Sequence, residues 1–245
     1  MLRKLCWLGC ALAVGCGDDF EAGGGSSTTS TSTTTTTTDT TSTGTGGGGT
    51  TTTNEGGSVP ASCDPIAIAD DFTSDSGAWS PQSNGEVQGE LAGGVLRFSA
   101  TAGATGEAAW LGSVQDVRNH CVFVEIPDSI LHGATTAARF ILGGPGGSLG
   151  LVVNAGSLTC IADVGTPEQA CNLAHDAVAH RWLRVRAADQ LVHFEASPDA
   201  ATWTSLGSIA AGPFLENLGP ILSLRVPQAA PADVLVAFDN FDVAP

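Results

Sequence analysis

The sequence has no tyrosine, one methionine and one lysine, and its 25 acidic residues far outnumber its 9 lysines and arginines. Two of the cations, Arg3 and Lys4, lie at the N-terminus, so the rest of the chain has seven arginines minus 25 acids, a net charge of −18. A nucleic-acid-binding domain needs a clustered basic surface, and an anionic membrane repels an acidic protein. This shortage excludes nucleic acid as a partner and leaves only lipid or hydrophobic attachment to a membrane.

The N-terminus also lacks an apolar run of the roughly 20 residues that a membrane-spanning helix needs. Residues 5–14 form a ten-residue apolar run that follows a short cationic start and precedes small residues. This arrangement is typical of the core of an export signal. We therefore expect residues 1–15 to be a signal peptide.

Gly15 and Cys16 end this segment as a small residue followed by cysteine. The segment resembles the lipobox of bacterial lipoproteins, although Ala13 departs from the leucine that is commonest there, and Cys10 is a competing but poorer site. The resemblance implies that Cys16 is lipidated and becomes the new N-terminus; cleavage and free secretion is the alternative. Because Gly17 follows rather than aspartate, it also implies a place in the bacterial cell envelope, at the outer membrane or the cell surface.

Residues 16–63 offer almost no side chains for a core. Between residues 26 and 53 there are 17 Thr, five Ser, five Gly and one Asp. Such a segment cannot bury enough apolar surface to offset the entropy lost on ordering. We expect a disordered linker here, followed by one domain over residues 64–245, which is long enough for a single core.

The domain alternates short apolar runs with Gly, Pro, Asn and Asp, which is typical of a β-sandwich or barrel. Residues 167–179 are the exception, for which we expect a short helix or a loop. About thirteen strands are more than the seven of an immunoglobulin domain, and this number favours a larger jelly roll. The predicted strands lie near residues 67–72, 86–91, 94–100, 107–112, 119–126, 135–142, 149–154, 157–164, 181–187, 190–197, 202–209, 219–226 and 233–243.

One predicted hairpin can be tested against its own sequence. Both of its strands alternate apolar residues with charged or aromatic ones. If residues 188–189 form the turn, Arg184 faces His193 and Trp182 faces Glu195. All the apolar side chains then lie on one side of the hairpin, and a slip of one residue would destroy the match.

The same hairpin supports a resemblance. Residues 180–186 read H-R-W-L-R-V-R, and after V-H-F-E-A-S-P-D the chain continues to T-W at residues 202–203. This succession resembles concanavalin A-like lectin/glucanase domains, although Ala200 replaces the glycine usual in that turn. The opening D-D-F at 70–72 and the closing F-D-N-F at 238–241 are similar to the terminal strands of such domains. The resemblance implies a two-sheet antiparallel β-sandwich, a jelly roll.

Four cysteines follow Cys16, and an even number in an exported protein predicts two disulfide bonds. Three pairings can be drawn. We favour Cys160–Cys171, which closes a short loop, and this leaves Cys63–Cys121 to fix the start of the domain. A zinc site is disfavoured, because there is no C-x-x-C motif.

Catalytic patterns are scarce. Glycoside hydrolysis needs two carboxyl groups flanking a cleft, and the glucanases that the domain resembles carry E-x-D-x-x-E or E-x-D-x-E on one strand. Neither pattern occurs. We interpret the pairs Glu86/Glu90 and Glu125/Asp128 as solvated faces, and we expect the chain not to be an enzyme.

Aromatic residues are the better candidates for a ligand, because the apolar face of a sugar can stack on a ring. We expect a monomeric protein that displays a non-catalytic binding domain, with carbohydrate as its ligand. A degenerate or unusual glycoside hydrolase and a purely structural envelope protein are the alternatives. The candidate ligand-binding residues are Trp182, Arg184, His193, Glu195 and Trp203.

The terminal strands also carry Asp70, Asp71, Asp239 and Asp242. Calcium takes several oxygen ligands, and pairing of these strands would bring the carboxylates together. Many concanavalin A-like domains hold a structural calcium ion. The resemblance therefore implies calcium as a candidate cofactor.

Overall fold

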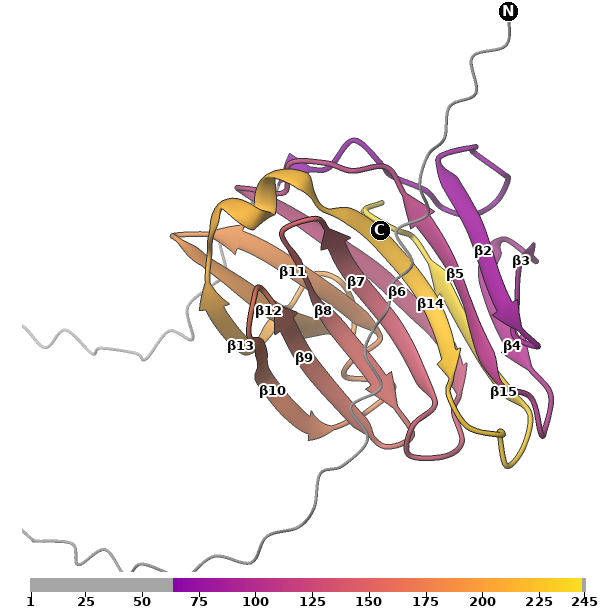
Figure 1. The fold of residues 1–245 in the computed structure, drawn as a ribbon. Coiled ribbons are helices and arrows are strands. Elements are labelled where there is room, and N and C mark those ends of the chain that lie inside the picture. Colours follow the sequence, from indigo (N-terminus) through magenta and orange to yellow (C-terminus); the bar gives the residue numbers. More distant parts are fainter. Residues whose placement is uncertain (1–63, 244–245) are drawn as a thin grey trace, which may run out of the picture. The chain divides into compact units, whose positions relative to one another are not determined.

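The computed structural model describes residues 64–243. They form a β-sandwich in which two sheets stack face to face (Figure 1), as predicted. Within these residues, no helix is long and apolar enough to cross a membrane. The elements in chain order are β1 (Asp64–Pro65), β2 (Trp79–Gly85), β3 (Gln88–Ala92), β4 (Val95–Ala100), β5 (Gly106–Gly112), β6 (His120–Ile130), β7 (Ala137–Gly144), β8 (Gly147–Asn154), β9 (Ser157–Asp163), β10 (Pro167–Ala174), β11 (Trp182–Ala188), β12 (Leu191–Ser197), β13 (Thr204–Ala210), the 3-10 helix η1 (Pro213–Asn217), β14 (Gly219–Val226) and β15 (Val234–Asp239).

The first sheet orders its strands β13-β12-β11-β6-β15-β4-β3, and β1 adds to β6 in parallel. The second sheet orders its strands β10-β9-β8-β7-β14-β5-β2. The last strands of the chain are inserted into the middle of each sheet, with β15 between β6 and β4 and β14 between β7 and β5. The outer face of each sheet is therefore assembled from distant parts of the sequence.

Alternation along each strand turns one face of both sheets into a common core. In β4, Leu96 and Phe98 are fully buried, whereas Arg97 points to the outer face and is half-buried. Phe98 meets Phe238 of β15 edge to face, with ring centroids 5.9 Å apart. Burial of each such phenylalanine contributes about 2–3 kcal/mol, so the core holds the two sheets together.

Three sequence predictions are wrong at the level of single elements. The strand expected at residues 67–72 is an irregular connection that makes only an isolated bridge from Asp70 to Phe241. Residues 167–174 form β10 instead of a helix or loop, because they pair along β9. The strand β2 was not predicted, because it is an exposed polar edge strand without apolar alternation, and Pro81 is tolerated at such an edge.

The predicted hairpin forms with its apolar side inward, but its register differs. The turn lies at Asp189 and Gln190, whose φ angles of 54° and 62° are those of a two-residue primed turn. Arg184 therefore stands opposite Glu195, and Trp182 opposite Ser197. The pairing has shifted by two residues, and an even shift keeps every side chain on its predicted face.

Candidate functional site

The outer face of β11 and β12 carries a cluster of charged and aromatic side chains centred on Glu195. Glu195 is 1% exposed, and its carboxylate accepts hydrogen bonds from Arg184 Nε at 2.6 Å and Arg186 Nη2 at 3.1 Å. Burial lowers the pKa of Arg184, and the Glu195 carboxylate opposes this change. The Glu195 cluster is thus a buried ion network, because the Glu195 carboxylate offsets the cost of removing two guanidinium groups from water.

Trp203, just before β13, closes one side of this cluster. The Arg184 guanidinium carbon lies 3.9 Å from the centre of its ring, and the indole N–H donates to the Ala200 carbonyl at 2.9 Å. Ala200 lies in the turn before Trp203, and its φ is 57°. Trp203 remains half-buried and lies 6.3 Å from the Phe123 ring, between centroids. Its indole is therefore held in one orientation while part of it meets solvent.

The other predicted ligand-binding residues are less accessible. Trp182 is on the outer face, as expected, but it is 5% exposed and packs against Phe123. His193 is half-buried, and its Nε2 is buried without a hydrogen-bond partner among residues 64–243. Burial lowers the pKa of His193, and the charge of Arg186 lowers it further, so both favour the neutral ring. The structure brings all five predicted residues together, but it leaves Trp203 as the one that offers a ring to a ligand.

A carboxyl pair that the sequence analysis did not connect lies on the same face. Glu125 of β6 stands directly opposite Asp239 of β15, an arrangement that places Cβ atoms about 4.5–5.5 Å apart. Arg181 Nε and Asn240 Nδ2 each donate to Glu125 at 2.6 Å. Burial raises the pKa of Asp239, and the charges of Glu125 and Asp71 raise it further. The two carboxyl groups thus differ in their surroundings, because Glu125 is paired to the Arg181 cation whereas burial favours the neutral form of Asp239.

The four acids expected to bind calcium make separate interactions. Asp70 accepts hydrogen bonds from the Phe72 amide, the Ser76 hydroxyl and the Trp79 indole. Asp71 accepts from Thr73, Asp239 accepts from the Asn240 amide, and Asp242 accepts from the Ile66 amide. Across residues 64–243 there is no group of three or more His, Cys, Asp or Glu side chains suited to a metal ion. These residues therefore do not fit a calcium site as a set, and calcium stays a prediction.

The cysteine pairing can be followed in part. The Cys160–Cys171 disulfide is present between register partners on β9 and β10, as predicted. Cys121 is disulfide-bonded, whereas its predicted partner Cys63 lies outside the described residues. The lipidation site, Cys16, also lies outside them.

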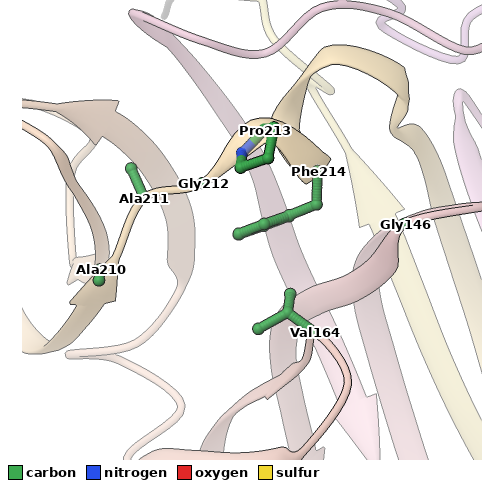
Figure 2. Close-up of a pocket in the computed structure, with 7 residues that line it drawn as sticks. All are labelled: Gly146, Val164, Ala210, Ala211, Gly212, Pro213 and Phe214. Carbon is green, nitrogen blue, oxygen red and sulfur yellow. The ribbon is translucent and has the colours of Figure 1, made fainter.

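Two other places on the molecule differ from the Glu195 cluster. On the outer face of the second sheet, Arg139 forms an ion pair with Glu107 at 3.0 Å. A hollow of about 580 Å³ lies where β13 approaches the turns after β7 and β9, and Figure 2 shows Phe214 reaching toward Val164 across it. None of the seven lining residues has a polar side chain, so few groups there could recognise sugar hydroxyls. The lining residues are Gly146, Val164, Ala210, Ala211, Gly212, Pro213 and Phe214.

Comparison with known proteins gives structural neighbours only. No family model and no curated protein matches the sequence. LamA from Zobellia galactanivorans, in complex with laminaritriose and laminaritetraose, superposes with a TM-score of 0.54 at 11% identity over 74% of this chain and 98% of its own. A laminarinase from Flavobacterium sp. UMI-01 gives 0.52 at 9% over 72% and 99%, and a glycosyl hydrolase family protein from Mycobacterium fortuitum gives 0.51 at 16% over 71% and 98%. At these identities the likeness shows the fold.

These neighbours contradict the expectation that the chain is not an enzyme. That expectation rested on the missing E-x-D-x-x-E spacing, yet proteins named as hydrolases share this fold. Spacing along one strand is not the only way to place two acids together. Glu125 and Asp239 become neighbours across two strands, so the missing motif does not exclude catalysis.

Proposed function

We propose that the domain recognises carbohydrate, and that the ligand stacks on the exposed part of Trp203 beside Phe123. A sugar ring presents its C–H groups as an apolar face, for which a fixed aromatic ring is a suitable surface. Ligand sites combine such surfaces with a few polar groups. The single observation that carries the proposal is the half-exposed indole held by Arg184 and by the Ala200 carbonyl. The hydrolase neighbours support carbohydrate as the ligand class.

The test is a glycan array with the full chain, with and without calcium, followed by titration of the glycans that bind. Laminaritriose and laminaritetraose, which LamA binds in its structure, are the first ligands to titrate. Trp203→Ala should weaken binding about tenfold, or about 1.4 kcal/mol, and Trp203→Phe should restore part of it.

Phe214→Ala is the matched control, because it removes a partly buried ring from the apolar hollow at the other site. Circular dichroism should show that each variant is folded. Equal losses in Trp203→Ala and Phe214→Ala, or no saturable binding to any glycan, would refute the proposal.

Glycoside hydrolysis is a second candidate function, favoured by the Glu125–Asp239 pair. Retaining glycosidases place their carboxyl groups about 5–5.5 Å apart, one ionised and one protonated. Release of reducing sugar from laminarin should be lost in both Glu125→Gln and Asp239→Asn. The matched control is Asp163→Asn, which changes an exposed acid on β9. Activity that survives in both variants would exclude this pair.

We further propose that the protein is exported and fixed to the outer membrane or cell surface by lipid on Cys16. The short cationic start, the ten-residue apolar run and the Gly15–Cys16 ending support this. Several acyl chains anchor a protein stably, because each buried CH₂ contributes about 0.8 kcal/mol. Mass spectrometry of the N-terminal peptide should show acylated Cys16, and Cys16→Ala should move the protein out of the membrane fraction. An unmodified N-terminus upstream of position 16 would refute the anchor.

A further inference from the structure

A second hollow, of about 350 Å³, opens on the outer face of the first sheet, away from the Glu195 cluster. Four strands contribute one residue each to its floor. Ile130 of β6 pairs with Leu235 of β15, Leu235 pairs with Ser99 of β4, and Ser99 pairs with Gln88 of β3. These four residues form a straight row across the sheet, which we call the Leu235 row.

The Leu235 row has the dimensions of a short saccharide. Neighbouring strands lie about 4.8 Å apart, so three gaps span roughly 14 Å. Its first half is aliphatic, and Ile130 is 49% exposed. Its second half carries a hydroxyl and an amide, and neither Ser99 nor Gln88 uses its side chain in a hydrogen bond to the rest of residues 64–243. One half can therefore meet C–H groups while the other meets hydroxyl groups.

Two carboxylates line the hollow beside this row. Asp233 accepts from the Ala102 amide through Oδ1 at 2.8 Å, and Glu86 accepts from the Thr105 amide through Oε2 at 3.3 Å. These bonds orient each carboxylate and leave its other oxygen without a partner among the described residues. Neither acid makes an ion pair within residues 64–243.

The lining contains no cation to balance these charges. Arg97, on the same face two residues before Ser99, stands opposite Glu90 in the ladder. Asp128 lies on the same rung, because Ala237 pairs with both Asp128 and Arg97. Four acids, Glu86, Asp233, Glu90 and Asp128, against Arg97 leave the hollow and this rung with a net charge of −3. A ligand with a carboxylate or sulfate group would be repelled, whereas one with an ammonium group would be attracted.

We propose that this hollow binds an amino sugar with a free ammonium group, such as a glucosamine unit, with its ring along the Leu235 row. The ammonium group lies between Glu86 and Asp233 and takes hydrogen bonds to their open oxygens. The inference rests on the proposed carbohydrate function, and it adds a ligand class and a second subsite to it.

The experiment is calorimetric titration of the full chain with glucosamine tetrasaccharide, in EDTA to exclude bridging metal ions. The N-acetylglucosamine tetrasaccharide, which lacks the charge, and laminaritetraose are the comparison ligands. We expect glucosamine tetrasaccharide to bind at least tenfold more tightly than its acetylated form at low salt. This preference should shrink at 0.5 M salt, because screening weakens exposed charges.

The variant Glu86→Gln/Asp233→Asn should abolish the preference while it keeps an oxygen for each backbone amide. Asp163→Asn, which removes an exposed acid from the second sheet, is the matched control and should keep it. Equal binding of the two tetrasaccharides, or a preference that survives the double variant, would overturn this inference. If laminaritetraose still binds and Trp203→Ala weakens it, the proposed function stands alone; if no saccharide binds, both fail.

Discussion

The two sheets fix their neighbouring strands by different chemistry. In the first sheet, β11 and β12 are joined on the outer face by Glu195 and its two arginines. In the second sheet, β9 and β10 are joined in the core by the Cys160–Cys171 disulfide. A buried ion network needs every partner, because a lone charge away from water is costly. A disulfide needs only an oxidising compartment, so the contact between β11 and β12 is sensitive to single substitutions, whereas the contact between β9 and β10 is sensitive to the redox state.

Removal of the charge at the centre of the Glu195 cluster should have the largest effect. Glu195→Gln leaves the Arg184 and Arg186 guanidinium groups without a carboxylate, in a place where Arg184 Nη2 already has no hydrogen-bond partner among residues 64–243. We expect the free energy of unfolding to fall by about 3–5 kcal/mol, measured by urea denaturation. A loss below about 1 kcal/mol would show that the cluster does not fasten the sheet.

Removal of the Cys160–Cys171 disulfide should lower the free energy of unfolding somewhat less than Glu195→Gln does. Its cysteines are 11 residues apart, and a closed loop of that length restricts the unfolded chain by about 3 kcal/mol. The double variant Cys160→Ala/Cys171→Ala should lose this amount in the same assay. It avoids a reducing agent, which would also act on Cys121. Unchanged stability would mean that pairing of β9 and β10 alone holds the edge.

A third effect depends on pH. Burial raises the pKa of Asp242 to about 7 from an ordinary 3.8, against the opposing hydrogen bond from the Ile66 amide. The folded state therefore favours the neutral acid, and its stabilising effect, fully present below about pH 4, is lost progressively as pH rises to about 7. Stability should fall by up to about 1.4 kcal/mol per pH unit between about pH 4 and 7 and level off above pH 7, where the acid is ionised in both states. Asp242→Asn keeps the oxygen and should flatten the curve between about pH 4 and 7; an identical slope in both proteins over that range would contradict the assignment.

The smallest effect should come from the second sheet's own ion pair. The side chains of Arg139 and Glu107 are 27% and 29% exposed, so solvent screens their 3.0 Å contact. Glu107→Gln should cost about 1 kcal/mol or less, and the loss should shrink in 0.5 M salt. A loss as large as that of Glu195→Gln would remove the distinction between the two sheets.

Local patterns were enough for much of the fold. Alternation placed Leu183 and Phe194 inward and Trp182 and Arg184 outward, because the period of a strand is two whatever its partner. The same argument could not fix the hairpin register, since an even slip preserves the faces, and the turn residues decided it. Segments without apolar alternation, such as β2, were missed because the prediction of strands depended on that alternation.

The amino-acid sequence by itself determined a β-rich domain, the orientation of its hairpin side chains and the short-range Cys160–Cys171 pair. Only the tertiary structure decided that Glu125 lies beside Asp239 and that Gln88, Ser99, Leu235 and Ile130 form one row. The physical reason is that the order of the strands is set by the burial of the apolar faces of both sheets in one core, which involves the whole domain. Cross-strand neighbours can therefore be more than a hundred residues apart, a distance at which no local spacing carries a signal.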